Sequence, residues 1–356
     1  MTGAPPALPS WQARREAGAR RHLVRLMAWL CRHLGWRVGA MLLYPITLWF
    51  FLADGAARAA SRRYLGRVMG KKPGVWAVFR HFHTFAQTVL DRFFLLDGDG
   101  KTRFEIGIEG IDHLARATAA GKGVLLLGAH LGSFDLLRLA AGRSAPAPVR
   151  MVMHHRERDA LTALFEACSP DFAASVIALP AAGEDGIALA LALRETLAAG
   201  GTIGLLADRP AAGQQALAVD FLGSPALFPL GPFRLAAATG APVLLGFGLR
   251  LGRRRYLVRI EPLAEVIPRA RTSDDVMGYR VCGPWAALSP YVIHYAERLA
   301  ALCREHPYNW FNFHDVWEIP RDAEPIGGPF RRSSHPRRPH PNGVGGGGIH
   351  HHRADG

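Results

Sequence analysis

The chain has 356 residues, 49% of them hydrophobic, and carries a formal charge of +14. Residues 104–320 alone are long enough for one α/β domain with a substantial core, so the composition excludes a wholly disordered protein. No CxxC spacing occurs, which excludes a cysteine-based zinc site and a disulfide framework and fits a reducing compartment. The scattered cysteines are Cys31, Cys168, Cys282 and Cys303.

The positive charge is concentrated at the N-terminal end of the chain. Residues 1–80 carry 14 Lys and Arg side chains against two acidic ones, Glu16 and Asp54. Residues 81–320 are almost neutral, with 23 basic and 24 acidic side chains. The basicity therefore belongs to an N-terminal arm, which we place at residues 1–72, and not to the body of the protein.

The same arm contains the longest charge-free stretch of the chain, residues 38–53. As a helix it would be roughly 24 Å long, shorter than the ~30 Å hydrocarbon core of a bilayer, and we expect Pro45 to kink it. Both flanks are basic, so the positive-inside rule does not choose an orientation, but a helix lying in an anionic leaflet would satisfy both flanks. The alternative is a buried core helix with a solvated basic face.

The body, residues 73–320, alternates apolar runs with helical patterns, which predicts an α/β fold with a mainly parallel central sheet covered by helices. The tail, residues 321–356, is rich in Gly, Pro, Arg and His and is predicted to be disordered. In chain order, the expected helices are 73–96, 134–141, 160–167, 186–199, 232–239 and 291–306, and the expected strands are 124–129, 149–153, 176–179, 203–207, 243–249 and 256–260.

A histidine and a carboxylate follow the first of these strands, five residues apart. Ser133 is a good N-cap, so Asp135 would lie in the first turn of the next helix and His130 in the loop before it. An Asp bound to one imidazole nitrogen leaves the other free to act as a general base. The alternative is an ordinary loop histidine and an ordinary helix-start residue.

A second polar pair, Asp208 and Arg209, follows the strand at 203–207. Asp208 is suited to orient a substrate amine or hydroxyl and Arg209 to bind an anionic group, although the two could also pair with each other or with solvent. Residues 219–236 then form an expected rigid apolar loop, where Phe221 and Gly223 would suit an acyl chain. Core packing explains the apolar residues of this loop equally well.

Motifs of other enzyme classes are absent from the sequence. A serine hydrolase elbow, Gly-x-Ser-x-Gly, does not occur, and neither does a phosphate loop or a dinucleotide fingerprint. Zinc-finger spacing and an aromatic-rich basic sheet pattern are also missing, so lipid head groups are the expected polyanion and nucleic acid is not. These absences leave cofactor-free acyl chemistry or a binding function, with no metal expected.

Taken in order, the motifs resemble those of the lipid A biosynthesis lauroyl/myristoyl acyltransferases, a branch of the lysophospholipid acyltransferase superfamily. The resemblance rests on His-x4-Asp at residues 130–135, on Ala-Asp at 207–208, and on the block from Phe-Leu-Gly-Ser-Pro at 221–225 to Thr-Gly-Ala-Pro-Val at 239–243. The N-terminal apolar segment resembles the membrane anchor of that family.

The resemblance implies transfer of a fatty acyl group from an acyl carrier protein or CoA thioester to a hydroxyl of a lipid or glycolipid, at the cytoplasmic face of the bacterial inner membrane. It implies that His130 deprotonates the hydroxyl and Asp135 holds the imidazole. Backbone amides at Gly132 and Ser133 are our candidates for the oxyanion donors. The family also has a basic residue between the first motif and the Asp, and Arg156 is its best counterpart here.

The aromatic ending at residues 307–317 resembles the Tyr-Asn-Trp-Phe-Asn-Phe ending of the branch associated with aryl polyene and xanthomonadin-type pigments. It indicates an acceptor other than a lipid A precursor, with an aryl polyenoyl group as a possible donor, and it also suits an aromatic plug over the core. Two other functions stay open: a membrane-bound esterase or thioesterase that uses the same dyad, and a non-enzymatic peripheral membrane-binding protein.

Overall fold

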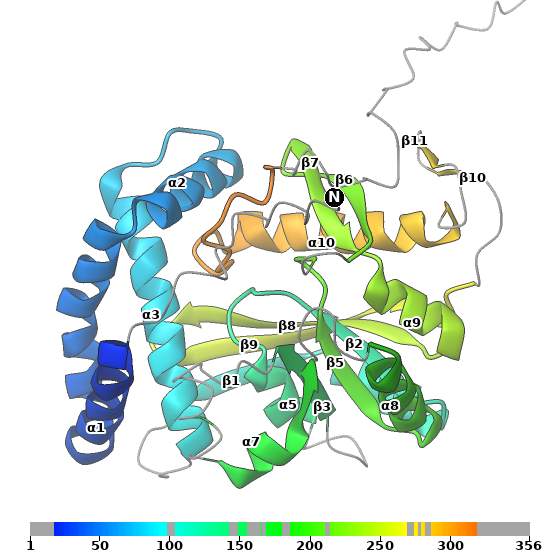
Figure 1. The fold of residues 1–356 in the computed structure, drawn as a ribbon, viewed down its shortest axis with the longest axis horizontal. Helices are drawn as coiled ribbons and strands as arrows, with labels where there is room; N and C mark the ends of the chain where they lie inside the picture. Colours follow the sequence, from blue (N-terminus) through cyan, green and yellow to red (C-terminus); the bar gives the residue numbers. More distant parts are fainter. Residues whose placement is uncertain are drawn as a thin grey trace, which may run out of the picture.

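A seven-stranded sheet with helices on both faces forms the centre of the protein, as the computed structural model in Figure 1 shows. The strand order is β1-β9-β8-β2-β5-β3-β4; β2, β3, β4, β5 and β8 run parallel, while β9 is antiparallel to β8 and parallel to β1. The predicted mainly parallel α/β sheet is thus confirmed. The structure describes residues 18–97, 104–141, 149–154, 165, 169–179, 186–210, 214–268, 274–276, 279–281 and 286–318.

Each predicted strand corresponds to a strand of the main sheet, and β1 joins them at one edge without having been predicted. The strands of the main sheet are β1 (Glu105–Glu109), β2 (Val124–Gly128), β3 (Val149–His154), β4 (Val176–Leu179), β5 (Thr202–Leu206), β8 (Val243–Gly252) and β9 (Arg255–Ala264). The helices are α1 (Gly18–Ala53), α2 (Gly55–Met69), α3 (Val75–Asp97), α4 (Ile111–Ala119), α5 (Asp135–Ala141), α7 (Pro170–Ser175), α8 (Gly186–Ala198), α9 (Gly231–Thr239) and α10 (Ser289–Glu305). Two small antiparallel pairs, β6 (Ala216–Phe221) with β7 (Ser224–Pro229) and β10 (Asp274–Val276) with β11 (Tyr279–Val281), complete the fold.

Strand β2 shows how the sequence divides the core between the two faces of the sheet. Successive side chains of a strand point to opposite faces, so Leu125 and Leu127 pack on the α10 side while Val124 and Leu126 pack on the α4 and α5 side. All four are fully buried. An apolar run without alternation is what a central parallel strand covered on both faces requires.

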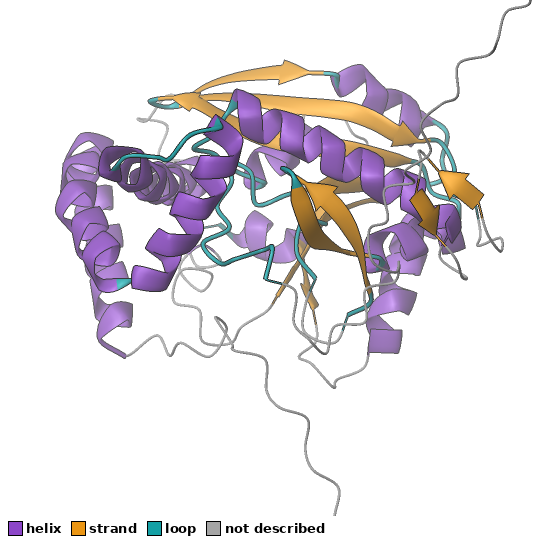
Figure 2. Ribbon diagram, turned by 90° about the horizontal axis from the view of Figure 1, so that it is seen from above, coloured by secondary structure: helices purple, strands orange, loops and turns teal. Residues whose placement is uncertain are grey.

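The three N-terminal helices pack together at one end of the sheet (Figure 2). Helix α1 breaks at Gly35, whose φ of 78° is left-handed, and then continues through Pro45. The non-helical backbone of α1 thus falls at Gly35, ten residues before Pro45, which lies on the exposed face of the helix. Helix α2 begins where the Asp54 carboxylate accepts a hydrogen bond from Ala57 N, 3.0 Å away.

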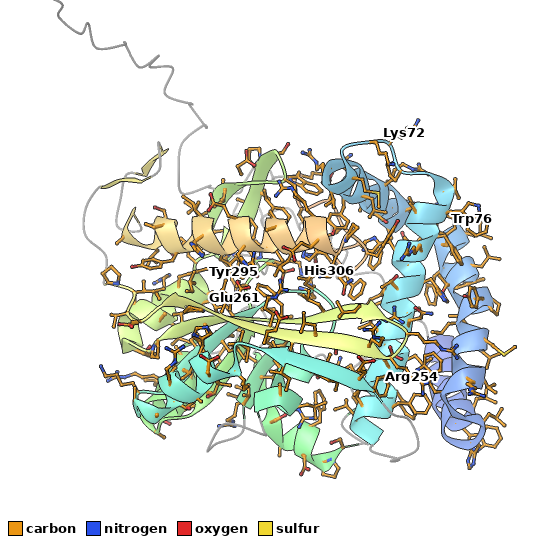
Figure 3. The ribbon with its side chains drawn as sticks, turned by 180° about the vertical axis from the view of Figure 1, so that it is seen from behind. Lys72, Trp76, Arg254, Glu261, Tyr295 and His306 are labelled. Carbon is orange, nitrogen blue, oxygen red and sulfur yellow. The ribbon has the colours of Figure 1, made fainter. Side chains whose placement is uncertain are left out.

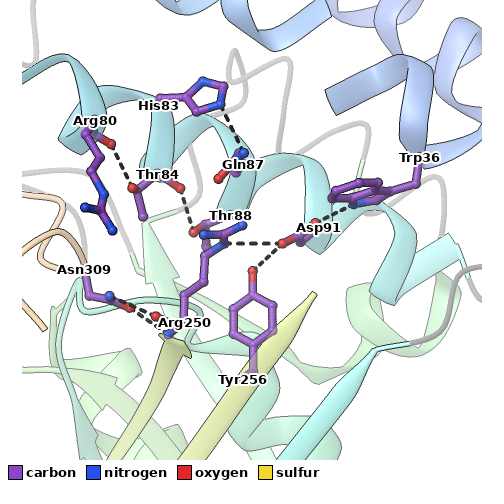
Figure 4. Close-up of polar contacts among 10 residues, drawn as sticks. All are labelled: Trp36, Arg80, His83, Thr84, Gln87, Thr88, Asp91, Arg250, Tyr256 and Asn309. Atoms are coloured by element: carbon purple, nitrogen blue, oxygen red, sulfur yellow. Dashed lines mark hydrogen bonds and ion pairs between the residues drawn. The ribbon is translucent and has the colours of Figure 1, made fainter. Parts of the chain in front are cut away.

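A buried polar network ties α1 and the sheet to α3 (Figure 4). The Asp91 carboxylate of α3 accepts hydrogen bonds from Trp36 Nε1 at 2.6 Å and from the Tyr256 hydroxyl at 2.7 Å, and it lies 3.5 Å from Arg250 Nε. The Asn309 side chain brackets the backbone of Arg250, accepting from its N and donating to its O. Because each partner comes from a different element, this network fixes the N-terminal helices against β8 and β9.

The segment expected to be a rigid apolar loop is instead a hairpin. Strands β6 and β7 are joined by Leu222 and Gly223, whose positive φ values of 54° and 84° are those of a tight two-residue turn. Pro232 lies in the first turn of α9, which begins at Gly231. Of the expected helix at 160–167 the structure describes only residue 165, which is helical, and the tail from 321 lies outside the described residues.

Candidate active site

The two polar motifs of the sequence meet because the strands that precede them are neighbours. Strand β2 pairs with β5 in parallel register, and Ala207 N donates to Gly128 O across the strand ends at 3.0 Å. His130 and Asp208 each lie two residues beyond these strands, at the carboxyl edge where α/β proteins place their sites. His130 Nδ1 is 2.8 Å from Asp208 Oδ1, and its backbone N donates to Asp208 Oδ2 at 3.0 Å.

The Asp208 carboxylate is completely buried and fully hydrogen-bonded. Besides the His130 backbone, Oδ2 accepts from Trp310 Nε1 at 2.9 Å and from Asn312 Nδ2 at 3.0 Å. Burial by itself would raise the pKa of Asp208, but the His130 imidazole and the Arg209 guanidinium hold that pKa well below its usual range. Asp208 is therefore an anion that receives the hydrogen bond from Nδ1–H and does not take its proton.

Arg209 lies at the other imidazole nitrogen, with its Nη2 3.1 Å from His130 Nε2. A guanidinium only donates, so in this contact Nε2 is the acceptor and the ring proton lies on Nδ1, toward Asp208. With the proton on Nδ1, Nε2 has the lone pair that a general base needs. The His130 side chain is 29% exposed, so it is accessible from solvent. Burial, followed by the charge of Arg209, also lowers the pKa of the nearby His314 to about 4, so that this ring is neutral at pH 7.

Asp135 takes a partner other than His130. Its Oδ2 lies 2.6 Å from Arg92 Nε of α3, and both side chains are largely buried. The predicted contact between Asp135 and the imidazole is thus replaced by one between Asp208 and the imidazole. The reason is geometric: Asp135 begins α5, whereas Asp208 lies two residues beyond β5, the strand that pairs with β2.

The backbone amides proposed as oxyanion donors are already bonded. Gly132 N donates to Asn309 O at 2.8 Å, and Ser133 N donates to Gly248 O at 2.7 Å. Gly132 has a φ of 66°, and a Cβ built on it would lie 2.0 Å from Gly248 O, so this approach requires glycine. The two amides serve to close the turn, which leaves Arg209 as the donor nearest the imidazole.

The remaining predicted site residues lie away from the imidazole or outside the structure's description. Phe221 is fully buried in an aromatic cluster with Phe228, Trp310 and Trp317, so it packs in the core. Gly223 stands at the hairpin turn. Arg156 lies outside the described residues.

Sequence reasoning missed two direct donors to Asp208, Trp310 and Asn312. They belong to the C-terminal segment 308–318, which runs alongside the turn after β2: Leu131 bridges Trp310, and Phe311 N donates to His130 O at 2.7 Å. The Asn-Trp-Phe-Asn pattern was the available signal. Trp310 is at once the expected aromatic plug, 1% exposed, and a hydrogen-bond donor to the site.

No group of three or more His, Cys, Asp or Glu that could hold a metal ion occurs in the described part of the chain. The His130 imidazole bonded to the buried Asp208 carboxylate, at the carboxyl edge of an α/β sheet, is an arrangement suited to general-base chemistry. The sequence model described as bacterial lipid A biosynthesis acyltransferase matches residues 15–318, and the chain belongs to this family. It is an acyltransferase, which confirms the resemblance. A search of the curated proteins finds no match to this chain.

Proposed function

We propose that this acyltransferase moves a fatty acyl group from an acyl carrier protein or CoA thioester to a hydroxyl of a lipid or glycolipid acceptor. The observation that carries the proposal is the position of the His130 imidazole, with Nδ1 bonded to Asp208 and Nε2 beside Arg209. A hydroxyl that displaces Arg209 from Nε2 meets a lone pair held in place by a fixed anion.

The transfer follows from these positions. Nε2 takes the proton as the hydroxyl oxygen attacks the thioester carbonyl, and the imidazolium that forms is stabilised by Asp208. The displaced Arg209 guanidinium then lies close to the oxygen on which negative charge develops. When the tetrahedral species collapses, the C–S bond breaks and the thiolate takes the proton from Nε2, which yields the ester and a free thiol.

For Asp135 we propose a positioning role. Its ion pair with Arg92 joins the start of α5 to α3. In that position it fixes the 130–135 turn, and the orienting role that the family resemblance assigns to it passes to Asp208.

The acceptor is proposed to lie in an anionic membrane, the bacterial inner membrane, with the site facing the cytoplasm. Within the described residues, one helical stretch, His33–Ala53, is long and apolar enough to cross a bilayer. Its inner side is bonded to α3: Trp36 to Asp91, and Thr47 Oγ1 to His83 Nδ1 at 3.2 Å. Its outer side exposes Met41, Tyr44, Leu48 and Leu52.

These contacts favour a helix that lies in one leaflet over one that spans the membrane. A spanning α1 would either leave α3 and break the bonds to Asp91 and His83, or draw those polar groups into hydrocarbon. An in-plane helix keeps both bonds and buries only its apolar outer face.

The test is a transfer assay on the detergent-solubilised protein with a labelled acyl thioester and a lipid acceptor. Substituting His130→Ala is expected to lower the rate by about 10² to 10⁴-fold, while His294→Ala, at an exposed histidine of α10, leaves it unchanged. Undiminished transfer by His130→Ala would overturn the proposal. Release of free fatty acid without any acylated lipid would indicate the esterase alternative.

The family match covers the family as a whole and does not single out the aryl polyene branch. Transfer of an aryl polyenoyl group is therefore a narrower proposal, carried by the C-terminal motif alone. Comparing aryl polyenoyl and saturated thioesters in the same assay tests it.

A further inference from the structure

A basic hollow lies on α2, outside the site described above. Its volume is about 560 Å³, and four of its seven lining residues are cationic: Arg62, Arg63, Arg67 and Lys72. Ala59, Gly66 and Pro73 complete the lining, and none of the seven is acidic. A concave surface that gathers this much charge of one sign concentrates anions.

Two of the four cations are held in place by the body of the protein. Arg67 Nη1 donates to Ser224 Oγ at 2.6 Å, and its guanidinium lies over the Trp317 ring at 4.5 Å. Arg63 forms an ion pair with Asp315. These contacts make the floor of the hollow rigid, and Asp315 offsets one of its four positive charges.

The other two cations lie at the rim of the hollow. Arg62 and Lys72 are exposed and form no ion pair or hydrogen bond with any residue that the structure describes. With a rigid floor and these two cations at the rim, the hollow has a net positive charge that an external anion can neutralise.

The hollow borders the exposed apolar surface. Val75 and Trp76 follow Lys72 closely and are 60% and 80% exposed. Trp76 contacts Phe79 edge-to-face, and Phe79 contacts Phe51 of α1 in the same way, so this end of α3 packs against the end of α1. Figure 3 shows Lys72 and Trp76 at the same end of the molecule, far from Glu261. The cations of the hollow lie beside an exposed indole and an apolar face, in the order in which a membrane leaflet places its phosphate groups, its interface and its hydrocarbon chains.

We propose that the basic hollow binds the phosphate group of an anionic membrane lipid, whose acyl chains lie along Trp76 and the outer face of α1. The inference rests on the membrane association proposed above. The C-terminal segment links the hollow to the candidate active site, because its Asp315 and Trp317 contact Arg63 and Arg67 of the hollow and its Trp310 and Asn312 bond to Asp208.

The experiment measures binding of the full chain to vesicles of phosphatidylcholine alone and of phosphatidylcholine with phosphatidylglycerol. The variant is Arg62→Glu with Lys72→Glu. Its control is Lys122→Glu with Arg194→Glu, which makes the same change in net charge at two exposed residues remote from α2. We expect the α2 variant to bind the anionic vesicles at least about tenfold more weakly, and the control to bind as the wild type does.

A soluble lipid, dihexanoyl phosphatidic acid, tests whether the hollow is a site or only a charged surface. Saturable binding that the α2 variant loses and the control keeps supports the proposal. An equal loss in both variants, or none in either, overturns it. So does unchanged vesicle binding by an α2 variant that has lost affinity for acyl carrier protein, because the occupant would then be an acidic protein.

The binding assays also separate this proposal from the proposed function. His130→Ala is expected to bind both lipids normally and to lack transfer. Retained transfer by His130→Ala would contradict the catalytic proposal without affecting the proposal for the basic hollow. Normal lipid binding by the α2 variant would contradict the proposal for the basic hollow without affecting the catalytic one.

Discussion

Replacing Asp208 with Asn is the sharpest test of the active site. Oδ2 accepts three N–H groups and Oδ1 accepts one, from His130 Nδ1. In the Asp208→Asn variant the amide oxygen would take the position with three donors, which turns the NH₂ toward Nδ1. The imidazole proton would then move to Nε2, where it meets Arg209 and where the base is needed. The fold survives because three of the four hydrogen bonds survive.

The expected loss follows from the wrong tautomer. The same change in a Ser-His-Asp triad lowers kcat by about 10⁴, so we expect Asp208→Asn to lower kcat by roughly 10³ to 10⁴, or about 4 to 5.5 kcal/mol of transition-state stabilisation. The matched variant is Asp135→Asn, which leaves the imidazole untouched and weakens the ion pair with Arg92. We expect it to lower Tm more than kcat. Initial transfer rates and thermal unfolding of both variants decide the matter: an active Asp208→Asn beside an inactive, fully stable Asp135→Asn would refute the assignment of Asp208.

Three further outcomes are expected. Trp36→Phe removes the hydrogen bond from α1 to Asp91 and should lower the free energy of unfolding by about 1 to 3 kcal/mol in a urea titration, because a buried acceptor loses a donor; no change would show that α1 is not held through this bond. Gly132→Ala would place its Cβ 2.0 Å from Gly248 O, so the rate of acyl transfer should fall steeply. Gly121→Ala is the control: this glycine also has a positive φ, but a Cβ there would have no atom within 4 Å, so the rate should not change. Equal rates for the two variants would contradict the close packing of the turn at Gly132. Burial lowers the pKa of His81 from 6.5 to about 4. Between these pH values the unfolded chain binds a proton at His81 and the folded chain does not, so the free energy of unfolding should fall as the pH drops from 7 to 4. The accompanying fall in Tm should be smaller for the His81→Leu variant.

The elements of the sheet could be predicted because each is a short apolar run bounded by turn residues. β4 matches its predicted range, and α3, α5, α8, α9 and α10 differ from theirs by one or two residues at an end. The antiparallel course of β9 could not be predicted, because direction is set by the tight turn after β8 and not by the apolar pattern. The hairpin at 216–229 could not be predicted from periodicity, because its two prolines indicated a loop. Pro225 and Pro229 lie in β7, which tolerates them because it pairs with β6 alone.

The residues of the candidate active site could be predicted from the sequence, but the contacts between them could not. His130, Asp208 and Arg209 each carry a local signal, a polar residue directly after a buried strand. Which carboxylate reaches His130 depends on β5 lying next to β2, a contact between residues almost 80 positions apart. Local spacing favoured Asp135, and only the strand order reveals Asp208. Arg92 had no signal at all, since it lies within a helix that reads as core.

The contacts of Asp208 set an order of events during synthesis. The outer face of α1 is complete once residue 53 has been made, whereas two of the donors that neutralise Asp208 are residues 310 and 312. At 5 to 20 residues per second the ribosome needs roughly 10 to 50 s for the chain between them. A nascent molecule therefore completes its apolar helix long before it completes the contacts of Asp208. If the base and the membrane association are as proposed above, acyl transfer would begin only on a nearly finished chain that has already had time to reach a membrane.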